Sequence, residues 1–117
     1  MAEEDESGRP DVETCIENCN ECQRLCLETV EYCLRLGGQH ASQVQIRRLT
    51  DCAHLCALAA DFIIRNSDLR AQACAFCAVA CERCADQCEF LADHDLQFQE
   101  CAEICAQCAE SCRELMR

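Results

Sequence analysis

Sixteen cysteines in a chain of 117 residues are the side chains of this sequence that could do chemistry. They fall into four groups, and within each group successive cysteines are three, four or seven residues apart. Because an α-helix turns once every 3.6 residues, these steps place the thiols on one face of a helix. The spacing therefore predicts four helices with inward thiols, and the candidate metal ligands are Cys15, Cys19, Cys22, Cys26, Cys33, Cys52, Cys56, Cys74, Cys77, Cys81, Cys84, Cys88, Cys101, Cys105, Cys108 and Cys112.

Two purely structural explanations account poorly for so many thiols. A free cysteine often packs as a small hydrophobic residue, but an axis lined with cysteine, where bundles usually carry leucine, would be underfilled. Disulfides within a helix are disfavoured, because residues three or four apart have Cβ atoms about 5–6 Å apart and a disulfide needs about 3.8 Å. Disulfides between helices remain possible. Metal binding explains the pattern better than either.

Among metals, Cu(I) fits the cysteine spacing best. Structural zinc usually uses Cys-x-x-Cys pairs on turns, whereas the four such pairs here lie inside predicted helices without glycine. No segment has the spacing of a ferredoxin cluster, and no Cys-x-x-Cys is followed by histidine as in attached haem. Cu(I) is soft, accepts two or three thiolates and replaces one thiol proton, so a buried column of thiolates can stay neutral. A zinc or iron–sulfur scaffold and a thiol redox protein remain the alternatives.

The elements that must position these thiols follow from the turn signals. Four helical segments are expected, over residues 12–36, 43–65, 69–92 and 96–117. Ser42 and Gln45 resemble a capping box at the start of the second segment. Short connections force neighbouring helices to run antiparallel. The predicted fold is all-α, an antiparallel up-down-up-down four-helix bundle with a cysteine-lined core over residues 12–117, preceded by a disordered acidic tail at residues 1–11.

Four motifs carry a resemblance to a known family: CIENCNECQRLC, DCAHLC, CAFCAVACERCADQC and CAEICAQCAESC. Over about residues 12–117 the sequence resembles the bacterial copper storage proteins. The resemblance implies a homotetramer of bundles that bind many Cu(I) ions along their cysteine stripes, with copper entering at a polar end. The second segment departs from the pattern, since it has only two cysteines and continues with Ala59, Ala60, Phe62 and Ile63. Copper filling is therefore expected to be thinner there.

Composition and charge exclude several classes of function. A net charge of −12 disfavours nucleic acid or an anionic membrane as a partner. No apolar run approaches the roughly 18 residues of a membrane span. The start of the chain has no basic segment followed by an apolar one, so a cytoplasmic, reducing location with free thiols is expected. No catalytic triad or glycine-rich phosphate loop is recognisable, so the protein is not expected to be an enzyme.

The second segment also predicts a contact between subunits. It is apolar nearly all round, with Leu55, Leu58 and Phe62 away from the thiol stripe. A helix on the surface of a single bundle should instead have a polar outer face. This outer face is therefore expected to be a subunit interface.

One end of the bundle is expected to admit copper. An antiparallel arrangement gathers His40, His94 and thiols of all four helices at one end, whereas the other end has Phe62 and Ile63. Because a cation gains most from a polar, open mouth, the entrance is expected at the His40/His94 end. His94 and His40 are candidate entrance ligands. His54 ranks last, because it lies between two cysteines of the stripe and so points away from it.

Overall fold

The structure, a computed structural model, describes residues 10–116. The predicted acidic tail lies outside the described residues except for Pro10 and Asp11, which already belong to the first helix. Within the described part, four α-helices and one short 3-10 helix are present, and no strand. They are α2 (Pro10–Leu36), the 3-10 helix η1 (Gly38–Ala41), α3 (Gln43–Ile64), α4 (Arg70–Ala92) and α5 (Leu96–Leu115).

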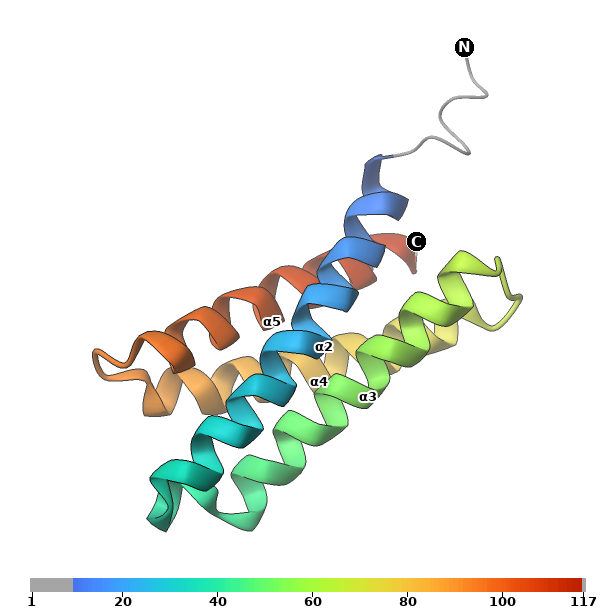
Figure 1. Ribbon diagram of the computed structural model, residues 1–117. Helices are drawn as coiled ribbons and strands as arrows, with labels where there is room; N and C mark the ends of the chain where they lie inside the picture. Colours follow the sequence, from blue (N-terminus) through green and yellow to red (C-terminus); the bar gives the residue numbers. More distant parts are fainter. Residues whose placement is uncertain (1–9, 117) are drawn as a thin grey trace.

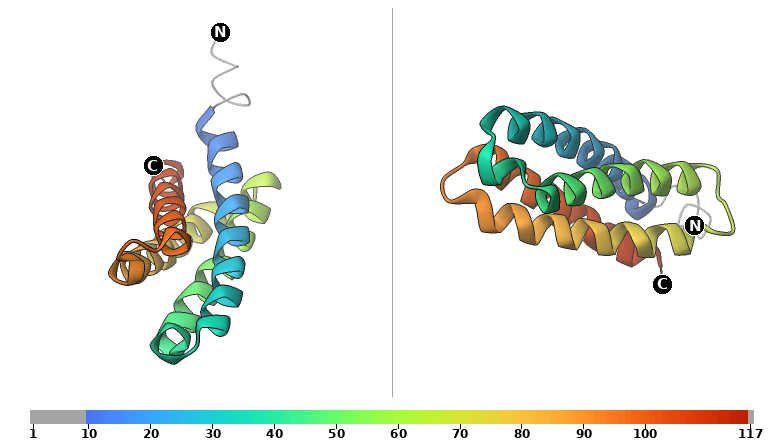
Figure 2. Two further views of the ribbon diagram at one scale, coloured as in Figure 1. Left: turned by 60° about the vertical axis from the view of Figure 1, so that its left-hand side comes forward. Right: turned by 90° about the horizontal axis from the view of Figure 1, so that it is seen from below.

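The predicted four-helix bundle is confirmed. Helix α2 packs against α3 and α5, and α4 packs against the same two helices. Consecutive helices run in opposite directions, which is the up-down-up-down topology (Figure 1). The α2–α3 pair crosses the α4–α5 pair obliquely (Figure 2). Each helix therefore turns one face toward a common axis.

The connection between α2 and α3 is longer than a simple turn. Gly37 and Gly38 have φ angles of +72° and +60°, which a residue with a Cβ rarely adopts, so the glycine pair ends α2 as predicted. The chain then forms η1, which the sequence analysis did not predict. The Ser42 hydroxyl caps α3 by accepting a hydrogen bond from the backbone N–H of Gln45, at 3.2 Å. This is one half of the predicted capping box.

The start of α5 is fixed by Asp95. Its carboxylate accepts a hydrogen bond from the backbone N–H of Phe98 at 3.1 Å and a second from the Tyr32 hydroxyl at 2.6 Å. The second bond joins α2 to α5 and raises the pKa of Tyr32 above its ordinary value. The predicted helix ends are otherwise right to within two residues, with α4 beginning one residue later than expected, at Arg70.

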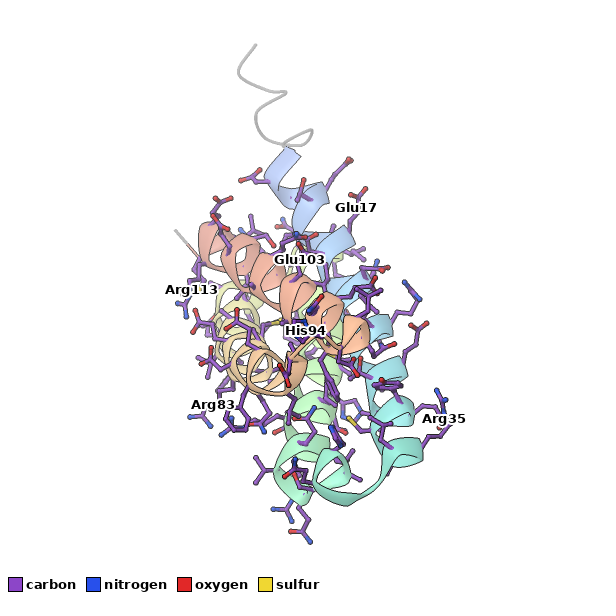
Figure 3. All side chains as sticks on the ribbon, turned by 90° about the vertical axis from the view of Figure 1, so that its left-hand side faces the viewer. Glu17, Arg35, Arg83, His94, Glu103 and Arg113 are labelled. Carbon is purple, nitrogen blue, oxygen red and sulfur yellow. The ribbon has the colours of Figure 1, made fainter. Side chains whose placement is uncertain are left out.

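The core is built from thiols and small side chains. All sixteen cysteines lie within the described residues, and each has no solvent-exposed surface. Buried alanines accompany them, and the largest fully buried side chains are Phe98 and Leu49. Charged side chains point outward all round the bundle, as Glu17, Arg83 and Glu103 do in Figure 3. None of the described helices is long and apolar enough to cross a membrane.

Candidate metal centre

The four cysteine stripes meet at the axis of the bundle and their sulfurs touch. The Sγ atoms of Cys22 and Cys105 are 3.6 Å apart, and those of Cys52 and Cys22 are 3.7 Å apart. The other sulfur pairs in contact are at most 4.0 Å apart, which is the distance between Cys22 and Cys26. These separations are close to van der Waals contact. The expected underfilling of the axis is therefore relieved, because the helices approach until the sulfurs pack against one another.

Twelve of the sixteen sulfurs form a continuous ladder. Among residues 10–116 there are five groups of four cysteines whose Sγ atoms all lie within 4.8 Å of one another. Each group shares two cysteines with the next, so no gap interrupts the series. In order along the axis the groups are Cys19, Cys77, Cys108 and Cys112; Cys56, Cys77, Cys81 and Cys108; Cys22, Cys52, Cys56 and Cys81; Cys22, Cys26, Cys52 and Cys105; and Cys26, Cys84, Cys101 and Cys105.

The four remaining cysteines extend the ladder at its two ends. Cys15 lies 3.8 Å from Cys112, and Cys74 is near both of these residues, whose thiols influence its pKa. At the opposite end Cys88 is near Cys101 and Cys84, whose thiols raise its pKa. Cys33 lies beyond it, and its hydrogen-bond partner is an amide rather than a sulfur. The structure thus brings thirteen of the predicted thiols within 4.0 Å of another thiol, places Cys74 and Cys88 near the ends of the ladder, and leaves Cys33 in contact with an amide.

Hydrogen bonds between thiols divide the protons unequally. The pKa of Cys56 is raised, mainly by its hydrogen bond with Cys108. The pKa of Cys108 is lowered, mainly by hydrogen bonds with Cys112 and Cys19. A thiol that accepts S–H bonds gains stabilisation of its thiolate form, and the thiol that donates keeps its proton. For Cys33, burial is the main cause, and it raises the pKa. The thiols of the column therefore hold their protons with different strengths.

Buried sulfur groups of this kind form a soft donor set, and comparison with known proteins identifies the family. Residues 9–117 match the sequence profile of Csp, the copper storage proteins. The chain belongs to the copper storage protein family. The sequence-based resemblance, drawn from four cysteine motifs, is confirmed by a match over nearly the whole chain.

Solved structures of two relatives share the fold. The Cu(I)-bound copper storage protein BsCsp3 is 37% identical, with a TM-score of 0.83 over 92% of this chain and 99% of that chain. The Nmul_A1745 protein from Nitrosospira multiformis is 34% identical, with a TM-score of 0.84 over 91% of this chain and 94% of that chain. The uncharacterized cysteine-rich protein YhjQ of Bacillus subtilis (strain 168) is 39% identical over 66 residues, which are 56% of this chain and 61% of that protein's length.

The candidate entrance histidines lie outside the thiol ladder. His94 is exposed in the tight connection between α4 and α5, with a φ of +72°, and it faces the viewer in Figure 3. His40, in η1, is half-buried, and its ring stacks on Phe98 with 5.8 Å between centroids. His54 is exposed on α3, as expected for a residue outside the stripe. Phe98 and Leu49, both fully buried, belong to the same end of the bundle as His40 and His94.

Gln45 is a site residue that the sequence analysis assigned to a different role. Its side chain does not complete the capping box, because the Ser42 N–H donates to the Gln39 carbonyl instead. The amide turns inward, is fully buried, and donates from Nε2 to the Cys33 sulfur at 3.7 Å. Its Oε1 atom is buried and has no hydrogen-bond partner within residues 10–116. The signal was present in the sequence, since Gln45 is seven residues before Cys52 and so lies on the thiol stripe.

The unpartnered oxygen of Gln45 should make the metal-free protein less stable than it could be. A buried polar atom without a partner costs about 1–3 kcal/mol. We expect Gln45→Leu, which removes the amide at similar volume, to raise the melting temperature of the metal-free protein by several degrees. Thermal unfolding followed by circular dichroism measures this change. An unchanged or lower melting temperature would show that the oxygen is satisfied, for example by a buried water.

Proposed function

We propose that this chain stores and buffers Cu(I) as a series of copper–thiolate sites inside the bundle. The observation that carries the proposal is the ladder of four-sulfur groups, in which each group shares two sulfurs with the next. A sulfur that is shared can bridge two ions, so the column suits many ions rather than one. Membership of the copper storage family and the likeness to Cu(I)-bound BsCsp3 support the same conclusion.

The spacing of the metal-free sulfurs is close to what Cu(I) requires. With a metal–sulfur bond of about 2.3 Å, three thiolates around one ion stand about 4.0 Å apart, and two thiolates in line stand about 4.6 Å apart. Sulfur pairs such as Cys26 and Cys101, at 3.9 Å, need only small side-chain rotations to reach either geometry. Each Cu(I) displaces a thiol proton, so the buried column gains no net charge as it fills.

Charge balance also favours Cu(I) over the other metals. Four thiolates around one Zn²⁺ fit the same distances, but each such site keeps two negative charges in the core. Overlapping groups would also compete for their shared sulfurs, so zinc could not use all five groups at once. An iron–sulfur scaffold needs room for inorganic sulfide between thiols that are already in contact. A redox role uses one or two accessible thiols, whereas these are fully buried.

The proposed ligands are all sixteen cysteines, the ladder thiols together with Cys15, Cys33, Cys74 and Cys88 at its ends. The thiols are free in the structure, and copper binding needs them reduced, so we place the protein in the reducing cytoplasm. We assign it a binding role rather than an enzymatic one. The entrance lies at the His40/His94 end, and the assembled form is a homotetramer.

Copper capacity tests the storage role directly. Sixteen thiolates hold about 8 ions when each ion has two sulfurs of its own and about 16 when every sulfur bridges, and we expect the upper half of that range. The measurement is an anaerobic titration with Cu(I) against a competing chelator. Loading should also raise the melting temperature strongly, because the ions bind only the folded column. Saturation at one or two Cu(I) per chain would contradict storage, and saturation at four Zn²⁺ with little Cu(I) would favour the zinc alternative.

The histidines at one end should control how fast copper moves in and out. The His40 ring stacks on Phe98. His94, four residues before Phe98, is exposed in the connection between α4 and α5. We expect the double variant His40→Ala/His94→Ala to slow Cu(I) uptake and release while total capacity stays nearly unchanged. Stopped-flow transfer to and from a chelator measures both rates. His54→Ala is the matched control, and slowed transfer in variants of Phe62 or Ile63 instead would reverse the assigned direction.

The outer faces of α3 and α4 form the proposed subunit contact. Leu55, Phe76 and Val79 line one hollow between these helices, and 66% of Phe76 is exposed. Arg48 and Arg83 border the same hollow together with Asp51. An apolar centre with a charged rim of both signs is the pattern of a protein interface. Leu58 and Phe62 follow Leu55 along the same face of α3.

Replacing Phe76 should separate the subunits. We expect Phe76→Glu to lower the mass measured by light scattering from four chains to fewer, because a carboxylate would be buried in the contact. Phe90→Glu is the matched control on the same helix, since Phe90 is 82% exposed and lies away from the hollow. A wild-type protein that is monomeric at micromolar concentration would contradict the assembly.

A further inference from the structure

We propose that Cys33 and Gln45 form a separate copper site of one thiolate sulfur and one amide oxygen, which is the last to fill and the first to empty. The inference rests on the proposed storage function and deepens it. It assigns a ligand, Gln45, that is not a cysteine. It also distinguishes one ion at the end of the column from the ions inside it.

The contact between the two side chains is the first observation. The Gln45 amide touches the Cys33 sulfur, with 3.7 Å between Nε2 and Sγ, and neither side chain has any exposed surface. Cys33 contacts an amide and has no sulfur among its hydrogen-bond partners, whereas thirteen of the other thiols contact at least one sulfur within 4.0 Å. A copper ion at Cys33 therefore needs a donor other than a neighbouring thiolate, or a shift of the helix to reach one.

The unpartnered oxygen is the second, independent observation. Oε1 of Gln45 is buried on the amide group that contacts the sulfur, and it accepts no hydrogen bond within residues 10–116. The last side-chain torsion of glutamine is broad and nearly two-fold, so the amide can turn its oxygen toward the sulfur. An ion held in line by bonds of about 2.3 Å to sulfur and about 2.1 Å to oxygen would separate the two atoms by about 4.4 Å. The amide nitrogen now lies 3.7 Å from the sulfur, so the two side chains need to move apart by less than about 1 Å.

The position of Cys33 and Gln45 at the end of the column suits a site through which Cu(I) passes as it leaves. Thr29, Gln45, Leu49 and Phe98 continue the four-residue and three-residue steps of the cysteine stripes but carry no thiol, and all four are fully buried. They close the column at the end where His40 stacks on Phe98. An ion leaving the ladder at this end meets Cys33 as its last sulfur. It then has only the Gln45 oxygen beside it.

The chemistry of the pair sets its affinity. Binding forms a Cu–S bond to Cys33 as the thiol proton leaves to solvent, and a second bond forms to the amide oxygen. A neutral amide oxygen is a hard donor and a poor match for soft Cu(I). The ion is therefore held more weakly than one between thiolates inside the ladder. Weak binding at the end of a column allows exchange with a carrier without emptying the column.

Two substitutions at the pair test the site. Anaerobic Cu(I) titration and release to an excess of the chelator bicinchoninic acid are measured for wild type, Gln45→Leu, Cys33→Ala and the double variant. We expect each single variant to lose about one Cu(I) per chain, all of it from the weakest and fastest-released fraction. The double variant should lose no more than either single variant, because both residues serve one ion.

Two glutamine variants provide the controls. Gln97 lies at the same end of the bundle, and its Nε2 donates a hydrogen bond to the Thr29 hydroxyl at 2.9 Å. Gln97→Leu therefore makes the same chemical change without touching a sulfur. This variant should keep the fraction of Cu(I) that is released fastest. Gln45→Glu retains an oxygen ligand and should keep the ion and slow its release. Circular dichroism verifies that each variant folds.

The outcomes separate this site from the storage function. If Gln45→Leu releases copper like Gln97→Leu, or if Gln45→Glu loses one Cu(I) per chain as Gln45→Leu does, the amide oxygen is not a ligand and the inference is overturned while storage stands. A wild-type capacity of one or two ions would overturn the storage proposal itself. Loss of the same single ion in Gln45→Leu and Cys33→Ala supports the two-donor site.

Discussion

Contact between sulfur atoms along the axis is the constraint on which the rest of this bundle depends. Thiols are short, so the four helices must approach closely before Cys22 can reach Cys52 and Cys105 at 3.6–3.7 Å. Buried alanines such as Ala53 and Ala78 flank the stripes and allow that approach. With so little volume in the core, only one large apolar side chain on each of α3 and α5, Leu49 and Phe98, is completely buried. The metal-free bundle therefore rests on many small contacts rather than on a few large ones.

The four helices and the burial of every thiol follow from the sequence because one repeat governs both. Steps of three and four residues define a helix and also define which face is turned inward. The grouping of thiols across helices did not follow, since it depends on how far each helix is shifted along the axis. That Cys22 of α2 lies between Cys52 of α3 and Cys105 of α5 is decided by the connections and crossing of the helices. No spacing within one helix contains this information.

Gln45 and Phe98 show how a local motif can compete with the pattern of the whole chain. The Ser-x-x-Gln sequence fits a capping box, but the same glutamine occupies a position on the thiol stripe. Once η1 supplies a carbonyl to the Ser42 N–H, the side chain of Gln45 is free to turn toward the core. Phe98 lies three residues after Asp95, which caps α5, and its backbone N–H donates to that cap. Its side chain is buried at the end of the bundle where the His40 ring stacks on it. The sequence did not indicate η1, so it did not indicate that the His40 ring would stack on Phe98.

Shared ligands have a consequence for how a partly filled column behaves. An ion bound by three sulfurs of one four-sulfur group holds at least one sulfur that also belongs to the next group, so a step along the axis need not release every ligand at once. The ion is never without sulfur during such a step. Empty positions can therefore diffuse through the interior in the way that vacancies diffuse through a crystal. A copper ion taken from the His40/His94 end would be replaced by one from deeper in the column, and the protein would deliver metal in a different order from that in which it was received.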